Sequence, residues 1–261
     1  MQHRGTGQSG HSGTGSGQRD YSRDAVRRIG RVFGMTANPA LGYASDLLVR
    51  LGGMTILSET SEVYGAEHLL TRRAKTPAIG QKLSDRIHWW EDYAERNGGE
   101  MDNNPSSGNR RGGLTTILEK SLGAVAKGGT APLCDVYKYG ERIDNKGFVF
   151  MDSPGFDPCS FTGQVDSGAN LIVFTTGRGS VSGYQPTPCI KLATNSEMYA
   201  RMAEDMDLNC GDIITDGVST EDKSEELFEI LSRVASADKT NSEELGFGGV
   251  EFVPWQVGAA M

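Results

Sequence analysis

The sequence predicts an α/β fold: a mostly parallel sheet with flanking helices, Rossmann-like, in two packed subdomains. Short apolar segments rich in β-branched and aromatic residues, such as 147–151 and 171–175, are typical of strands buried on both faces. In the second half of the chain these segments alternate with stretches of helical periodicity, which favours parallel strands joined by helices. Glycine is abundant, at 35 of 261 residues, as expected for many tight loops at strand ends.

The first half of the chain is predicted to hold two long helices and one short strand. The first helix is expected to have Asn38 as its cap and Pro39 at its first position. The pair Gly52-Gly53 ends it, and residues 54–58 then form a strand. A longer amphipathic helix ends at residues 97–99, and its apolar stripe comprises Ile79, Leu83, Ile87 and Trp90.

The second half is predicted to alternate between helices and strands. Helices are expected at residues 115–126, 160–168 and 196–206, followed by a last long helix capped near Ser219. Strands are expected at residues 133–139, 147–151, 171–175 and 189–193.

Composition divides the chain into further regions. Residues 1–20 are mostly Gly, Ser, Thr, Gln and His, which cannot bury enough apolar surface to offset the entropy of ordering, so a disordered tail is expected. Residues 100–113 are rich in Asn, Pro, Ser, Gly and Arg, which is typical of a linker. We therefore expect a partial central domain over residues 21–99 and a C-terminal α/β domain over residues 114–261.

Charge and cysteine usage narrow the class of protein. The net charge of −8 argues against a nucleic-acid partner. No apolar run approaches the roughly 20 residues that a membrane span needs, so no membrane partner is expected. The four cysteines form no C-x-x-C pair, which indicates reduced thiols rather than a zinc site. We expect a cytoplasmic protein that acts on a small molecule.

The segment Thr175-Thr176-Gly177-Arg178-Gly179 follows a predicted strand, where parallel α/β sheets bind their ligands. Arg178 can grip a carboxylate or phosphate with two hydrogen bonds, and the glycines allow a close approach to the backbone. The alternative is a simple glycine turn whose arginine pairs with a neighbouring acid. A dinucleotide site is not indicated, because that fingerprint needs a helix within the glycines and prolines follow here.

Two further clusters also lie at predicted strand or helix ends. Glu59, Glu62 and His68 combine carboxylate and imidazole groups that suit divalent iron, manganese or magnesium, or they simply decorate a helix N-terminus. Lys120 follows a predicted helix start at Thr115 and Thr116, where free backbone N–H groups can bind an anion. The alternative for Lys120 is a solvated helix face. An acidic protein that binds an anion must gather its cations locally, and the available set is Arg72, Arg73, Lys120, Arg178 and Lys191.

Several strings of residues resemble the altronate/galactarate dehydratase family. They run in unbroken order between about Gly34 and Met261 and comprise 38–42, 58–59, 64–70, 104–106, 112–116, 119–123 and 174–179. The chain is similar to the carboxyl-terminal portion of these enzymes. The upstream part that family members place before Asn38 is absent from this sequence.

The resemblance implies a cytoplasmic hydro-lyase that removes water from a sugar acid such as altronate or galactarate and yields a 2-keto-3-deoxy acid. It implies a divalent metal, usually Fe²⁺, with Mn²⁺ or Mg²⁺ as alternatives. It also leads us to expect a homo-oligomer, or association with an N-terminal dehydratase fragment.

On this reading, Glu62 and His68 serve the metal or the acid/base steps, and Glu59 is a further metal ligand. Lys120 neutralises developing charge, and Arg178 holds a substrate carboxylate. The remaining expected substrate contacts are Arg72, Thr115, Thr116, Thr175, Thr176, Gly177 and Gly179. Two alternatives stay open: a non-catalytic or partner-dependent fragment that binds sugar acids, and a Rossmann-like nucleotide-binding domain.

Overall fold

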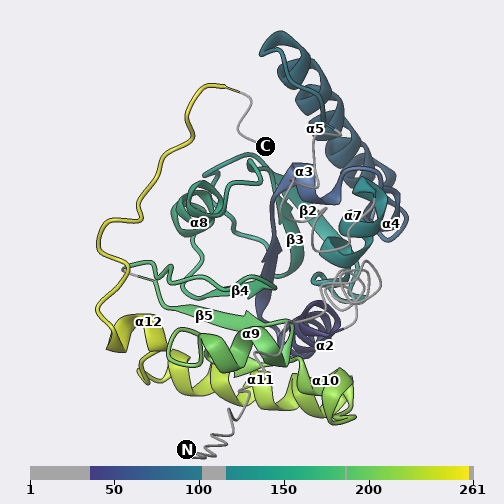
Figure 1. Cartoon of the computed structure of the whole chain (residues 1–261). Helices are drawn as coiled ribbons and strands as arrows, with labels where there is room; N and C mark the ends of the chain where they lie inside the picture. Colours follow the sequence, from purple (N-terminus) through teal and green to yellow (C-terminus); the bar gives the residue numbers. More distant parts are fainter. Residues whose placement is uncertain (1–35, 102–115, 186, 259–261) are drawn as a thin grey trace, which may run out of the picture.

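The computed structural model describes residues 36–101, 116–185 and 187–258, and confirms the predicted α/β class (Figure 1). In these ranges, six parallel strands form two three-stranded sheets with the orders β1-β3-β2 and β4-β5-β6. The strands are β1 (Met54–Leu57), β2 (Leu133–Tyr137), β3 (Gly147–Met151), β4 (Ile172–Thr176), β5 (Cys189–Ala193) and β6 (Leu208–Asn209). The expected tail, the linker from residue 102 onward and Thr115 lie outside the described residues.

The helices flank these two sheets. They are α2 (Ala37–Arg50), α3 (Thr60–Val63), α4 (His68–Thr71), α5 (Pro77–Arg96), α7 (Ile117–Ala126), α8 (Asp157–Asp166), α9 (Ser196–Arg201), α10 (Asp212–Thr215), α11 (Thr220–Ala235) and α12 (Asn241–Glu244). Within the described ranges, no helix combines the length and the apolarity needed to cross a membrane.

The first sheet brings two distant loops to one edge. β1 pairs in parallel with β3, with Met54 opposite Gly147 and Leu57 opposite Phe150. All five residues of β3 are buried, as a continuous apolar run predicts for a central strand. Because parallel strands end at the same edge, the loops that follow β1 and β3 lie together, although about 90 residues separate them in sequence.

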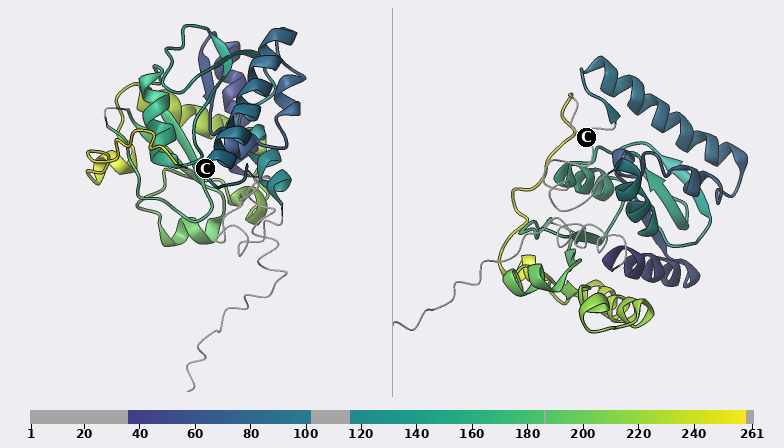
Figure 2. Two further views of the ribbon diagram at one scale, coloured as in Figure 1. Left: turned by 90° about the horizontal axis from the view of Figure 1, so that it is seen from above. Right: turned by 45° about the vertical axis from the view of Figure 1, so that its right-hand side comes forward.

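The helix α2 joins the two halves of the molecule. It contacts β1 and β3 of the first sheet on one side and α11 on the other, and Figure 2 shows it between these elements. Ala37 and Ala44 of α2 share a buried apolar cluster with Ile190 and Leu192 of β5. Small side chains on α2 let the helix approach the second sheet closely.

Several predicted elements differ from the structure in their limits, most of them by one or two residues. Asn38 is not the cap of the first helix, since that position belongs to Thr36; the Asn38 side chain is buried and donates to the Gly123 carbonyl. The helix expected from residue 160 begins at Asp157, and the helix expected to reach residue 206 ends at Arg201. Each difference reflects a long-range contact or a local turn. The hydrophobic periodicity of the sequence predicts neither.

The expected division at residues 100–113 does not coincide with the separation of the sheets. The strand β1 precedes that segment, and its partner β3 follows it. The domain limits stay a prediction, with the first sheet formed from both sides of the segment.

A buried carboxylate fixes α2 against the start of β2. Both oxygens of Asp46 accept the Thr130 backbone N–H, at 2.9 and 2.8 Å, and one accepts the Ala131 N–H at 2.9 Å. The Thr130 hydroxyl adds a bond of 2.7 Å. Asp46 is 8% exposed, so its carboxylate depends on these donors for its hydrogen bonds.

We predict that Asp46→Ala lowers the free energy of unfolding by about 2–4 kcal/mol, because the backbone and hydroxyl donors of Thr130 and Ala131 lose their shared charged acceptor. Urea denaturation measures the change. The control is Asp92→Ala, which removes an exposed carboxylate 3.7 Å from Arg96 and is expected to cost less than about 1 kcal/mol. Equal losses in the two variants would contradict this account of Asp46.

Candidate functional site

The loop after β1 places Glu59 in a conformation that non-glycine residues rarely adopt. Its φ is 72° and its ψ is 78°, in the left-handed region. The loop after β3 holds this geometry, because the Glu59 N–H donates to the Ser153 hydroxyl (3.0 Å) and the Thr60 N–H donates to the Ser153 carbonyl (2.9 Å). Strained backbone of this kind costs about 1–3 kcal/mol and clusters at functional sites.

A second carboxylate, Asp152, connects the same two loops by hydrogen bonds. One oxygen accepts the Thr60 hydroxyl and the Trp90 indole N–H, both at 2.6 Å, and Arg86 lies 3.8 Å from the other. Burial raises the pKa of Asp152, while the hydrogen bonds from Thr60 and Trp90 oppose the rise. Asp152 therefore joins β3, α5 and the residue next to Glu59 into one rigid unit.

Glu59 holds its proton well above the usual range for a carboxyl group. Burial raises the pKa of Glu59 to about 8; the nearby carboxylates Asp157 and Glu62 add to the rise, and Lys127 and Lys120 oppose it. At neutral pH the group is mainly a neutral acid that can donate a proton. A pKa close to the working pH is what acid/base catalysis requires.

The helix α7 and its C-cap, Lys127, supply two lysines to this cluster. Thr116 caps the helix by accepting the Glu119 N–H at 3.2 Å, and Lys120 follows one turn later. The ammonium of Lys120 donates to the Glu62 carboxylate at 2.5 Å. Lys127 lies seven residues after Lys120, a spacing that places both side chains on one helix face.

Asp157, the first residue of α8, completes the cluster from the β3 side. Burial raises its pKa; Lys127 and Lys120 oppose the rise, and Glu62 adds to it. Three carboxyl groups and two lysines thus meet where β1 and β3 end.

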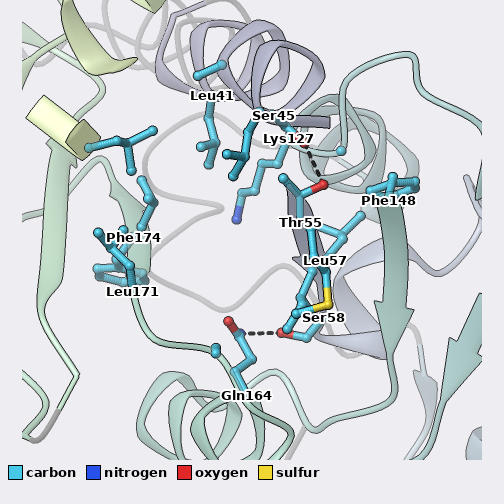
Figure 3. A pocket seen from close by; sticks show the side chains of 18 of the residues that line it. Leu41, Ser45, Thr55, Leu57, Ser58, Lys127, Phe148, Gln164, Leu171 and Phe174 are labelled. Carbon is cyan, nitrogen blue, oxygen red and sulfur yellow. Dashed lines mark hydrogen bonds between the residues drawn. The ribbon is translucent and has the colours of Figure 1, made fainter. Parts of the chain in front are cut away.

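A cavity of about 350 Å³ opens beside this cluster, lined on one side by β1 and on the other by β4 (Figure 3). Helices α2, α8 and α11 complete its walls. Figure 3 shows Lys127 extending into the middle of the space, and Glu59 is a second charged residue in the lining. Among the described residues, no hydrogen bond or ion pair engages the Lys127 ammonium. It is therefore positioned to receive an anion.

Hydroxyl and amide groups are spaced around the otherwise apolar walls. The Gln164 amide donates to Ser58 at 2.5 Å, at the foot of the view in Figure 3. Ser45 donates to Thr55 at 2.9 Å across the α2–β1 side. Asn170, Thr175 and Ser232 also line the cavity. A space with one cation, one acid and several hydroxyl-binding groups fits a small hydroxylated anion.

The loop after β4 lies largely outside this cavity. Thr175 lines it, but Arg178 is exposed and is not part of the lining. Thr176 is buried and shapes the loop, since its hydroxyl accepts the backbone N–H groups of Arg178 (3.3 Å) and Gly179 (3.2 Å). Gly177 accepts from the Asn195 side chain at 3.0 Å. The structure does not bring these glycines into the cavity lining.

The structure brings the expected metal ligands Glu59 and Glu62 into one cluster but does not add His68 to it. Glu62 is ion-paired with Lys120, Glu59 is mainly neutral at pH 7, and His68 is exposed on α4. Arg72 is exposed as well. No group of three or more His, Cys, Asp or Glu side chains suited to a metal ion occurs among the residues described. These side chains do not fit a divalent-metal centre, so no chemical step is assigned to a metal here.

Sequence reasoning did not single out Lys127 or Gln164. Lys127 precedes Gly128-Gly129 and looks like an ordinary lysine at a helix C-terminus. The spacing of seven residues from Lys120 could have indicated that the two lysines share one helix face. Asp157 follows the predicted strand at residues 147–151, but the sequence alone does not identify its partners.

A carboxylate and lysine cluster at the carboxyl ends of parallel strands, next to a small and mostly apolar cavity with a few polar groups, is typical of an α/β protein that acts on a small anion. Residues 31–260 match the family model described as D-galactarate/Altronate dehydratase, C-terminal. The chain therefore belongs to this family.

Curated relatives agree with the family. Over 214 residues the chain is 41% identical to galactarate dehydratase (L-threo-forming) of Escherichia coli (strain K12) and 37% identical to altronate dehydratase of Bacillus subtilis (strain 168). These matches cover 82% of the chain but only 41% and 43% of the relatives. The beta subunit of (2R)-sulfolactate sulfo-lyase of Chromohalobacter salexigens is 32% identical over 216 residues, which are 82% of the chain and 56% of that subunit. The chain thus spans about two fifths of the two dehydratases.

We predict that Glu59→Gln stabilises the protein increasingly as the pH rises. The folded state keeps a proton on Glu59 that the unfolded chain releases above pH 4.5. The destabilisation by Glu59 therefore grows as the pH rises from 4.5 to about 8, and it stays constant above pH 8. Glutamine carries no such penalty, so the variant should gain a few kcal/mol over the parent at pH 9 and almost nothing at pH 4.

Urea denaturation at pH 4, 7 and 9 measures the difference. Glu95→Gln, at an exposed position on α5, is the matched control and should show no comparable trend. A gain for Glu59→Gln that is the same at every pH would show that its pKa is not raised.

Proposed function

We propose that this chain carries acid/base and anion-binding groups of a hydro-lyase that removes water from a sugar acid of the altronate or galactarate type and yields a 2-keto-3-deoxy acid. The observation that carries the proposal is Glu59, a strained and largely protonated carboxyl group at the edge of a cavity into which Lys127 extends. Family membership supports the reaction class, since the relatives named above include two sugar-acid dehydratases.

The reaction first requires a cationic group that binds the substrate carboxylate. Removing the proton next to that carboxylate creates a dianionic enediolate, which fixed cations must stabilise. Lys127 is placed to bind the carboxylate within the cavity, where apolar walls strengthen the attraction. Lys120, already bonded to Glu62, adds positive charge nearby.

The second requirement is an acid and a base. Glu59 is the proposed acid: its neutral form donates a proton to the departing β-hydroxyl, which leaves as water. Glu62 is the proposed base that accepts the α-proton, and its backbone N–H bonds to the Glu59 carbonyl at 2.9 Å within the same turn. The carbon–oxygen bond breaks as the electrons of the carbon–hydrogen bond form the enol, which rearranges to the keto acid.

The residues after β4 have a secondary role in this proposal. Thr175 lines the cavity and can bond a substrate hydroxyl, and Arg178 can reach an anion only from the exposed rim. Thr116, which caps α7, and the glycines Gly177 and Gly179 act by shaping backbone. A divalent metal, with Fe²⁺ as the expected ion, and a role for His68 and Arg72 remain proposals for the whole dehydratase.

A partner remains part of the proposal. The chain spans about two fifths of the two dehydratases, and the sulfolactate enzyme is named as having a beta subunit. We propose that an upstream portion, or a second copy of the chain, assembles with this one in the cytoplasm. The alternative, a fragment that binds sugar acids without turning them over, predicts binding with no product under any combination.

The test is keto-acid formation from altronate and galactarate, with Fe²⁺, in the presence and absence of the upstream portion of a dehydratase relative. Lys127→Met and Glu59→Gln should each lower kcat/KM at least about 100-fold, whereas Arg178→Ala should lower it less than about tenfold. In the parent, kcat/KM should fall as the pH rises through about 8, because the acid form of Glu59 is then lost.

Unchanged activity in Lys127→Met or Glu59→Gln would remove these residues from the mechanism. A loss in Arg178→Ala equal to that of Lys127→Met would move the carboxylate site to the loop after β4.

A further inference from the structure

We infer that the cavity selects sugar acids with one carboxylate, the aldonates, over sugar acids with a carboxylate at both ends, the aldarates. The inference rests on the proposed function, because it takes the cavity to be the substrate site. It concerns a choice that family membership leaves open, since the relatives include a galactarate dehydratase and an altronate dehydratase.

The cavity lining holds few charged side chains. Among the described residues that line it, Lys127 is the one cation and Glu59 the one acid. An aldonate places its single carboxylate against Lys127. An aldarate brings a second carboxylate into a space where the described lining offers it no further cation.

The walls of the cavity on the β4 and α11 sides are mostly apolar. The β4 side presents Leu171 and Phe174, which Figure 3 shows across the cavity from Leu57 and Phe148. The α11 side presents Phe228, Leu231 and Ala235, with Ser232 as its polar exception. A carboxylate held against such walls loses its hydration without gaining a partner, and this loss is strongly unfavourable.

The remaining polar groups of the lining are uncharged and can form hydrogen bonds with substrate hydroxyls. Ser58, Gln164, Asn170 and Thr175 are neutral donors and acceptors, and the terminal hydroxyl of an aldonate can bond to any of them. Neutral groups can also bond a carboxylate, but they do not compensate its charge. Specificity here therefore follows from an unpaired charge on the disfavoured ligand.

The test uses ligand pairs that differ only at the terminal carbon: galactonate with galactarate, and altronate with altrarate. Isothermal titration calorimetry on the full chain at pH 7 gives the dissociation constants, and keto-acid formation gives kcat/KM. We expect each aldonate that binds to do so at least about tenfold more tightly than its aldarate. Lys127→Met should remove the binding of both.

A gain-of-function variant makes the test sharper. Ser232→Arg adds a cation to the α11 side of the cavity and should raise the affinity for the aldarate at least about tenfold relative to the aldonate. Ser236→Arg is the matched control: it adds the same charge four residues later, at the exposed C-cap of α11 outside the lining, and should leave the ratio unchanged.

The outcomes separate the two claims. Equal or tighter binding and turnover of the aldarate would overturn the selectivity and leave the proposed dehydration standing. Failure of every acid to bind and react would overturn both. An aldonate preference that survives Lys127→Met would also overturn the inference, because the preference would then arise elsewhere.

Discussion

The parallel pairing of β1 with β3 is the constraint on which the rest of the site depends. It brings Ser153 against the turn that follows β1, and the two hydrogen bonds from that turn to Ser153 hold Glu59 in its left-handed conformation. Asp152 secures the same contact through Thr60 and Trp90. Without this pairing, Glu59 would relax toward an ordinary backbone geometry and its carboxyl group would become hydrated.

Charge compensation within the cluster follows from that geometry. Three carboxyl groups in close proximity would repel one another if all were ionised, so one of them keeps a proton unless cations intervene. The helix α7 and its C-cap provide Lys120 and Lys127, but only Lys120 is engaged by a carboxylate at hydrogen-bond distance. Lys127 therefore balances the charge of Glu59 and Asp157 from a distance and extends into the cavity. The same side chain can tune the acid and bind a substrate anion.

Local sequence was sufficient to predict most of the fold. The run at residues 147–151 is continuous and apolar, and the run at 189–193 is apolar except for Lys191; the strands β3 and β5 have these limits. The two-residue strand β6 carries too little pattern to be recognised, and its pairing depends on β5. The carboxylate cluster was partly predictable, because Glu59 and Glu62 follow a strand. The conformation of Glu59 was not, because it is set by Ser153, 94 positions away. Arg178 looked equally promising in sequence, and only the fold shows that it faces outward.

The most direct measurement of the central claim is the titration of the Glu59 carboxyl group by ¹³C NMR on glutamate-labelled protein, with its signal assigned by loss in Glu59→Gln. The account predicts a midpoint near pH 8 that shifts upward when Lys127 is replaced by methionine, because a nearby cation is removed. A midpoint near pH 4.5, or a midpoint that is unchanged in Lys127→Met, would contradict it.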